Sequence, residues 1–167
     1  MVVRGAVKIA LSLGLAFGVM FALGARADQD NNSAPVPLAE GSKLGTLVNP
    51  YQAKEDAHDQ ALADEGHKLF GNYGCPGCHG FGGGGGMCPP ITNGVWIYGD
   101  KDDTLFRLVS LGSAELQSKY GLTRQATENI VAPMPSMGTV IPKADDLWKI
   151  ISWIKIQAYT NVKNNPQ

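Results

Sequence analysis

The sequence lacks the features expected of an ordinary metal site, a nucleic-acid binder or a β-sheet protein. It has three cysteines and a single C-x-x-C pair, so no second pair completes the four ligands of a structural zinc site. The formal net charge is −1, and binding to a nucleic acid would call for a basic surface patch. No alternating strand pattern of useful length and no internal repeat are present. These absences favour a small all-α protein.

The N-terminus has the three parts of a secretory signal peptide. Arg4 and Lys8 give a basic start, residues 9–24 form an uncharged run of 16 residues, and A-R-A at 25–27 gives a cleavage pattern. The run is shorter than the roughly 20 residues that span a bilayer, which disfavours the alternative of a retained membrane anchor. We expect residues 1–27 to be removed on export to the periplasm, with no stable membrane insertion afterwards. Removal of three basic residues leaves 11 Lys and Arg against 15 Asp and Glu, a net charge of −4, and this acidic balance argues against a nucleic-acid partner.

Composition divides the rest of the chain into three parts. Residues 28–57 are rich in Asn, Pro, Ser and Gly and show no helical period. They are predicted to form a flexible N-terminal extension that is either disordered or laid over the domain. Residues 58–160 are predicted to form the folded domain, and residues 161–167 a short C-terminal tail.

Three helices are predicted within the domain from the spacing of apolar residues. They cover residues 59–72, 102–112 and 144–159. Residues 113–133 are predicted to be a long loop, and loops of this length are often functional when ordered. We expect this loop to form part of a surface on which partners dock.

The most informative stretch is CPGCHGFGGGGGMCPP, at residues 75–90. A thioredoxin-like dithiol would follow a strand, and a phosphate loop would need a lysine after its glycines; neither condition is met. C-x-x-C-H after a helix in an exported chain is typical of covalent haem attachment, in which both thiols become thioethers and the histidine binds the iron. The sequence therefore predicts one haem c attached through Cys75 and Cys78, with His79 as an axial ligand.

From residue 59 to residue 159 the order of these features resembles the class I c-type cytochromes. In that family a glycine and an aromatic residue of the first helix cross an aromatic residue of the last helix, and the matching residues here are Gly66, Phe70 and Trp153. A Met-Pro precedes the last helix of the family, and this chain has PMPSMG there. The resemblance implies the class I cytochrome c fold, a small helical domain wrapped around one covalent haem.

The resemblance also implies further haem contacts. Met134, the methionine of Met-Pro, is expected to be the second axial ligand, which would raise the reduction potential. Met137 is the alternative, and is otherwise expected to pack against the haem. The carbonyl of Pro89 is expected to accept a hydrogen bond from Nδ1 of His79, which would fix the imidazole ring.

Other residues near the motif are assigned further roles. Trp96 and Tyr98 are expected either beside the haem propionates or among ordinary core aromatics. Cys88 stands where the family usually has glycine, and we expect an inert buried thiol or an intermolecular disulfide. The glycine run is expected to allow close passage of the backbone by the haem. His58 and His67 are expected on the surface.

The stretches WIYGDKDDTLFRLVSLGS and PMPSMG resemble the cytochrome c-L type, which accepts electrons from periplasmic quinoprotein (PQQ) alcohol dehydrogenases in methanol oxidation. This likeness implies an electron carrier rather than an enzyme, with such a dehydrogenase as donor and another cytochrome or a terminal oxidase as acceptor. Two alternatives remain open: a haem subunit of a multi-subunit oxidoreductase or oxidase, and a haem sensor or peroxidase with an open sixth site.

Overall fold

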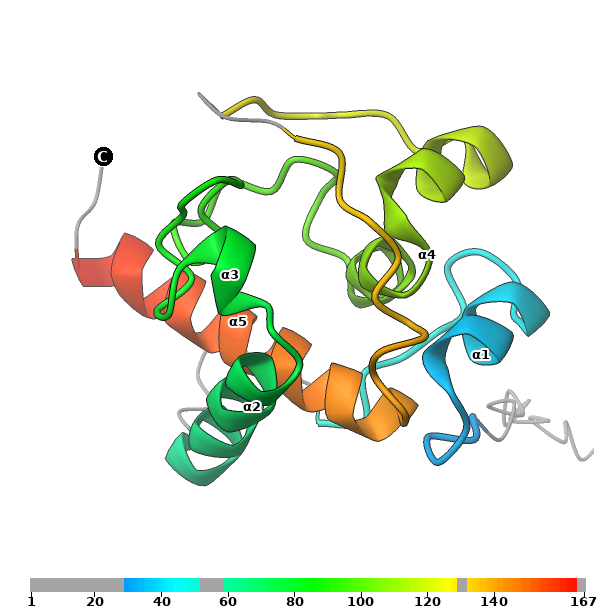
Figure 1. Ribbon diagram of the computed structural model, residues 1–167, viewed down its shortest axis with the longest axis horizontal. Coiled ribbons are helices and arrows are strands. Elements are labelled where there is room, and N and C mark those ends of the chain that lie inside the picture. The colour runs from blue at the N-terminus through cyan, green and yellow to red at the C-terminus, as the bar shows by residue number, and fades with distance from the viewer. Residues whose placement is uncertain (1–28, 52–58, 129–131, 165–167) are drawn as a thin grey trace, which may run out of the picture.

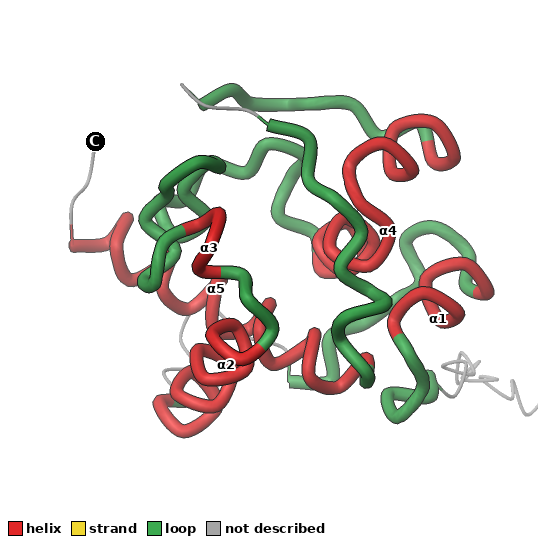
Figure 2. Tube along the Cα trace, in the orientation of Figure 1, coloured by secondary structure: helices red, strands yellow, loops and turns green. Residues whose placement is uncertain are grey.

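The computed structural model describes residues 29–51, 59–128 and 132–164 (Figure 1). The predicted signal peptide and His58 lie outside these residues. The helices are α1 (Pro35–Gly41), α2 (Gln60–Asn72), α3 (Pro76–His79), α4 (Asp102–Tyr120) and α5 (Ala144–Asn164). Within the described ranges the chain is helix and loop without strands (Figure 2), which confirms the all-α prediction. None of these helices is long and apolar enough to cross a bilayer.

Helix α2 packs directly against α5 (Figure 1). Its buried face consists of Ala63, Gly66 and Phe70, four or three residues apart, which is the spacing of one helical face. A methyl group on Gly66 would lie 2.2 Å from the Lys149 carbonyl oxygen, so only glycine permits this approach. The rings of Phe70 and Trp153 lie 4.7 Å apart between centroids. The contact expected between the first and last helices is therefore confirmed.

Helix α4 departs from the prediction in its second half. It bends at Gly112, where φ is +84° and ψ is 164°, and then continues as helix to Tyr120. The prediction that residues 113–133 form a loop was therefore wrong for residues 113–120. That stretch has one fully buried apolar residue, Leu116, which is too few to give a helical period.

Helix α5 is also longer than predicted and includes residues 161–164, which were expected to belong to a tail. Tertiary contacts account for the extra turn. Asn161 Nδ2 donates a hydrogen bond of 2.8 Å to the Thr92 carbonyl, and Val162 packs close to Gly94. These contacts with the segment before α4 outweigh the modest helix propensity of Thr, Asn and Val.

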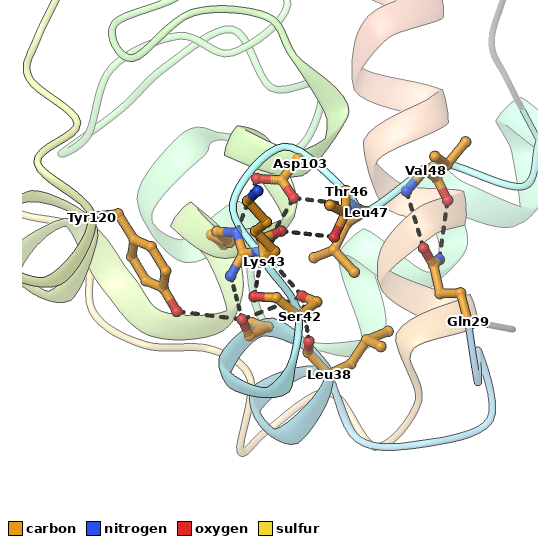
Figure 3. A network of polar contacts seen from close by, with 11 residues as sticks. Gln29, Leu38, Ser42, Lys43, Thr46, Leu47, Val48, Asp103 and Tyr120 are labelled. Atoms are coloured by element: carbon orange, nitrogen blue, oxygen red, sulfur yellow. Dashed lines mark hydrogen bonds and ion pairs between the residues drawn. The ribbon is translucent and has the colours of Figure 1, made fainter. Parts of the chain in front are cut away.

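Residues 29–51, here called the N-terminal strap, lie over the domain and include α1. Ala39 and Leu47 are buried in the core, and two hydrogen bonds between the side chain of Gln29 and the backbone of Val48 close the strap on itself (Figure 3). The composition left disorder and packing over the domain as alternatives, and the strap is packed. Seven residues beginning with Pro-Val-Pro are too short to show a helical period, so α1 was not predicted.

The strap is held to α4 by hydrogen bonds to two buried, oppositely charged residues of that helix, Arg107 and Asp103, which pair with each other at an Nε–Oδ2 distance of 2.9 Å. The Arg107 guanidinium is 0% exposed and also donates to the Ala39, Ser42 and Lys43 carbonyls. Asp103 accepts the Leu47 N–H at 3.0 Å, and Figure 3 shows this carboxylate facing the strap. Both buried charges are thus paired and hydrogen-bonded, as buried charges must be to persist.

The α2–α5 contact predicts the effect of a single methyl group. Gly66→Ala should lower the free energy of unfolding by about 1–3 kcal/mol, because the added carbon collides with backbone that cannot move freely. Chemical denaturation of the purified protein measures this change. Gly71→Ala is the matched control on the same helix, since nothing lies within 4 Å of a methyl group there. It should stabilise the protein by about 0.5–1 kcal/mol, and equal losses in the two variants would refute the close contact.

Candidate functional site

The C-x-x-C-H motif forms a single short helical turn directly after α2. Cys75 N donates to the Phe70 carbonyl at 3.2 Å, and His79 N donates to the Cys75 carbonyl at 3.1 Å. Helix α3 therefore continues from the end of α2 with a fixed orientation. The side chains of Cys75, Cys78 and His79 all line one cavity.

The ring of His79 is held by the backbone beyond the glycine run. Its Nδ1 lies 2.8 Å from the Pro89 carbonyl oxygen. Because a carbonyl only accepts hydrogen bonds, Nδ1 carries the proton, and the lone pair of the neutral ring is on Nε2. An imidazole fixed in this way has Nε2 available to a metal ion.

The glycine-rich segment folds back on the motif through backbone hydrogen bonds. Gly85 N donates to the His79 carbonyl at 2.8 Å, and Cys88 N donates to the Cys78 carbonyl at 3.0 Å. The side chains of Phe81 and Met87, both on this segment, are 73% and 70% exposed. The segment thus fixes His79 through backbone hydrogen bonds and exposes two large apolar side chains to solvent.

A second wall of the cavity comes from residues 132–143, here called the Met loop. Met134 and Met137 both line the cavity. Ser113, just after the bend of α4, donates its N–H to the Met134 carbonyl at 2.9 Å, and its Oγ accepts the Met134 N–H at 3.1 Å. These hydrogen bonds bring the Met134 backbone close to Gly112. Glycine permits the close approach, because a methyl group at position 112 would lie 2.9 Å from the Met134 carbonyl oxygen.

The polar side chains of the cavity gather around Tyr98. Trp96, Tyr98 and Arg124 all line the cavity, and the Tyr98 hydroxyl accepts hydrogen bonds from Gln117 at 3.0 Å and from Arg124 at 3.4 Å. Arg124 was predicted only as part of a loop, and its place in the cavity was missed. A lone arginine in a loop gives no sequence signal that would have found it.

Cys88 lines the cavity beside Cys78 and is half-buried. Burial, followed by the hydrogen bond to Cys78, raises the pKa of the Cys88 thiol. Burial also raises the pKa of Cys75 to about 11. The thiolate is the nucleophilic form of cysteine, and the inert role of Cys88 stays a prediction.

The sequence predicted His67 on the surface, but in the structure its ring is partly covered. Its ring stacks on Trp153 with 4.7 Å between centroids, and its Nε2 lies 2.8 Å from the Phe81 carbonyl oxygen. It is half-buried between α5 and the glycine-rich segment. The prediction failed because the neighbour that covers His67 comes from a loop without periodicity.

The residues present fit a haem c. The lining is mainly apolar, with contributions from α4, α5 and the loops between helices, as a flat apolar ring requires. The donors are two thiols in one helical turn, an imidazole and thioether sulfurs. No group of three or more His, Cys, Asp or Glu side chains in the described ranges could hold a bare metal ion, which disfavours a zinc centre at the motif.

The chain matches a known protein family. The family model described as Cytochrome c matches residues 63–157, which is more than half of the chain. Searches of curated proteins and of solved structures gave no significant match. The matched region begins within α2, contains the whole C-x-x-C-H motif and the Met loop, and ends within α5. The chain therefore belongs to the cytochrome c family, whose members are electron carriers with haem c bound covalently through the cysteines of this motif, here Cys75 and Cys78.

Proposed function

We propose that this protein carries single electrons in the periplasm, with His79 and Met134 as the axial ligands of its haem. The supporting observation is that both residues line one cavity. His79 belongs to α3 and Met134 to the loop before α5, which are separate segments of the fold (Figure 1). Each is also fixed by hydrogen bonds: His79 through Nδ1 to Pro89, and Met134 through its backbone to Ser113. Two soft or borderline donors held in this way suit iron in a haem.

Met134 is a better candidate for the sixth ligand than Met137. Met137 packs against the buried core of the domain, whereas Met134 is not among the residues of that core. The backbone N–H of Met137 donates to the Val109 carbonyl at 2.9 Å, which holds it along α4. Met137 thus has a packing role in the core, and Met134 lines the cavity without belonging to that core.

The haem supplies one-electron exchange at its iron. The chain's own part is to hold two ligands, exclude water and control access. Apolar residues from α4 and α5, among them Leu108, Ile150 and Ile154, line the cavity and keep bulk solvent away from the site. If His79 and Met134 both bind the iron, no position would be left for a substrate, and the site would transfer electrons without chemical conversion.

Trp96, Tyr98 and Arg124 are proposed to hold the carboxylate groups of the haem. Arg124 brings a positive charge to the cavity lining, and the Tyr98 hydroxyl, already bonded to Gln117, is positioned beside it. Arg and Tyr both donate hydrogen bonds to carboxylates, and the charged bond is the stronger one. The apolar part of the cavity would then hold the porphyrin ring of the haem.

We further propose a quinoprotein alcohol dehydrogenase as electron donor, and another cytochrome or a terminal oxidase as acceptor. The resemblance of WIYGDKDDTLFRLVSLGS and PMPSMG to the c-L type supports this donor. The exposed Phe81 and Met87 next to the haem motif supply apolar contact area for a small, transient interface of the kind that redox partners form.

The axial ligands are tested by substitution at the two methionines. Met134→Ala should abolish the thioether-to-iron charge-transfer band of the oxidised protein, lower its midpoint potential and open the iron to cyanide. Met137→Ala is the matched control from the same loop. It should keep the band and cost about 0.5–3 kcal/mol in the free energy of unfolding, through lost packing.

Absorption spectroscopy and redox titration of both variants give the answer. If Met137→Ala loses the band while Met134→Ala retains it, Met137 is the ligand. A wild-type protein without the band would favour the alternative of a haem sensor or peroxidase with an open sixth site.

The donor is tested by rapid mixing of the oxidised protein with a PQQ alcohol dehydrogenase and its alcohol. The haem should be reduced with a second-order rate constant that varies with ionic strength, as expected for charged partners. Phe81→Ser should lower this constant about tenfold, as for a residue central to an interface. Leu44→Ser, which alters an exposed apolar side chain on the strap, should change it little. Reduction no faster than by an unrelated dehydrogenase would remove the quinoprotein donor.

A further inference from the structure

The N-terminal strap contacts the middle of the Met loop and the helix that follows the loop. In its middle the loop is attached to α4, since Gly138 N donates to the Ser110 carbonyl at 3.1 Å. At its end the loop leads into α5 at Ala144. The strap binds α4 and the first turn of α5, so the two attachment points of the loop are connected through the strap as well as through the loop itself.

The contact with α5 is made by backbone groups of the strap. Ala144 N donates to the Ser33 carbonyl and Asp145 N donates to the Asn31 carbonyl, both at 2.8 Å. The first N–H groups of a helix have no partner within the helix, and the strap supplies two. Trp148 Nε1 adds a hydrogen bond of 3.1 Å to the Asn31 side chain. The strap therefore fixes where α5 begins, and with it the end of the Met loop.

The contact with α4 depends on Arg107. Its guanidinium binds Asp103 on its own helix and three strap carbonyls. It also lies 4.7 Å from the ring centroid of Tyr120, whose hydroxyl donates to the Ala39 carbonyl at 3.3 Å. No other residue type could satisfy so many acceptors with one planar group, and lysine would replace only part of them.

The strap also contacts the Met loop directly. Val36 of α1 packs on Gly138, so closely that a methyl group on Gly138 would lie 2.6 Å from Val36 Cγ2. Gly138 is four residues after Met134, and the intervening Ser136 donates through Oγ to the Ser110 carbonyl at 2.6 Å. The loop is thus pressed between the strap on one face and α4 on the other.

We propose that the strap is a positioning element for the axial methionine, with Arg107 as its main attachment and Val36 as its contact with the Met loop. The strap holds the loop in the arrangement in which Met134 lines the cavity, where it would bind the iron. This inference rests on the proposed ligation by Met134. Arg107 and Val36 do not line the cavity, so they act through the loop and not on the haem.

The test measures how often Met134 leaves the iron. An added ligand such as imidazole binds only when the methionine is displaced, so its apparent affinity rises in proportion to the displaced fraction. Arg107→Lys should increase the displaced fraction about tenfold, and the affinity of the oxidised protein for imidazole should rise by the same factor. Val36→Ala should raise it by a smaller factor, and both variants should show a weaker charge-transfer band and a lower midpoint potential.

Lys119→Gln is the matched control, because Lys119 joins α4 to the strap through an exposed ion pair with Glu40 and should leave imidazole affinity unchanged. If Arg107→Lys does not fold, Val36→Ala decides. A wild-type band with unchanged imidazole affinity in the folded variants would overturn the role of the strap and leave the ligation intact. Absence of the band in the wild-type protein would overturn both.

Discussion

The direct packing of α2 on α5 closes one side of this small domain, while the apolar faces of α4, α5 and the intervening loops line a cavity. That cavity is the constraint on which the rest of the structure depends. Apolar surface left facing water costs about 25 cal/mol per Å², so the domain is complete only when a large apolar group fills the space. Haem c, attached through the two cysteines of the motif, is that group, and the loops of the protein are arranged around it.

A cavity of this kind has to be closed by segments that lack regular structure of their own. The glycine-rich segment is held by hydrogen bonds to α3, and the Met loop by hydrogen bonds to the bend of α4. The glycine-rich segment leads to Pro89, whose carbonyl orients His79, and the Met loop carries Met134, the proposed second ligand. Long loops gain order only by binding to something rigid. The bend at Gly112 and the N-terminal strap supply rigid surfaces on two sides of the Met loop.

The parts of the fold that could be predicted from sequence are those with a regular period or a fixed motif. Gly66 and Phe70 fall on one face of a helix, and C-x-x-C-H has a specific chemistry, so the helix and the covalent haem followed from residue spacing. The crossing of the first and last helices followed from the resemblance to the class I cytochromes. The second half of α4 was missed because its burial depends on Leu116 and on contacts far away in the sequence. Periodicity within a short window does not record such contacts.

The strap and Arg107 could not be predicted for a related reason. The strap owes its order to the guanidinium of Arg107, which pairs with Asp103 four residues earlier and then binds carbonyls more than 60 residues away. An Asp–Arg pair at this spacing is usual on exposed helix faces, so nothing in the sequence marks it as buried. The position of Arg124 in the cavity lining likewise left no signal in the sequence.

Met134 is the methionine proposed to bind the iron, held in place by its loop. The most direct test is the NMR spectrum of the reduced wild-type protein with ¹³C-labelled methionine methyl groups. A methyl group bound at the iron lies over the haem ring, and the ring current moves its proton signal far upfield. The account predicts one such signal, which persists when Met137 is replaced by Leu. Loss of the signal on that replacement, or its absence from the wild-type spectrum, would contradict the account.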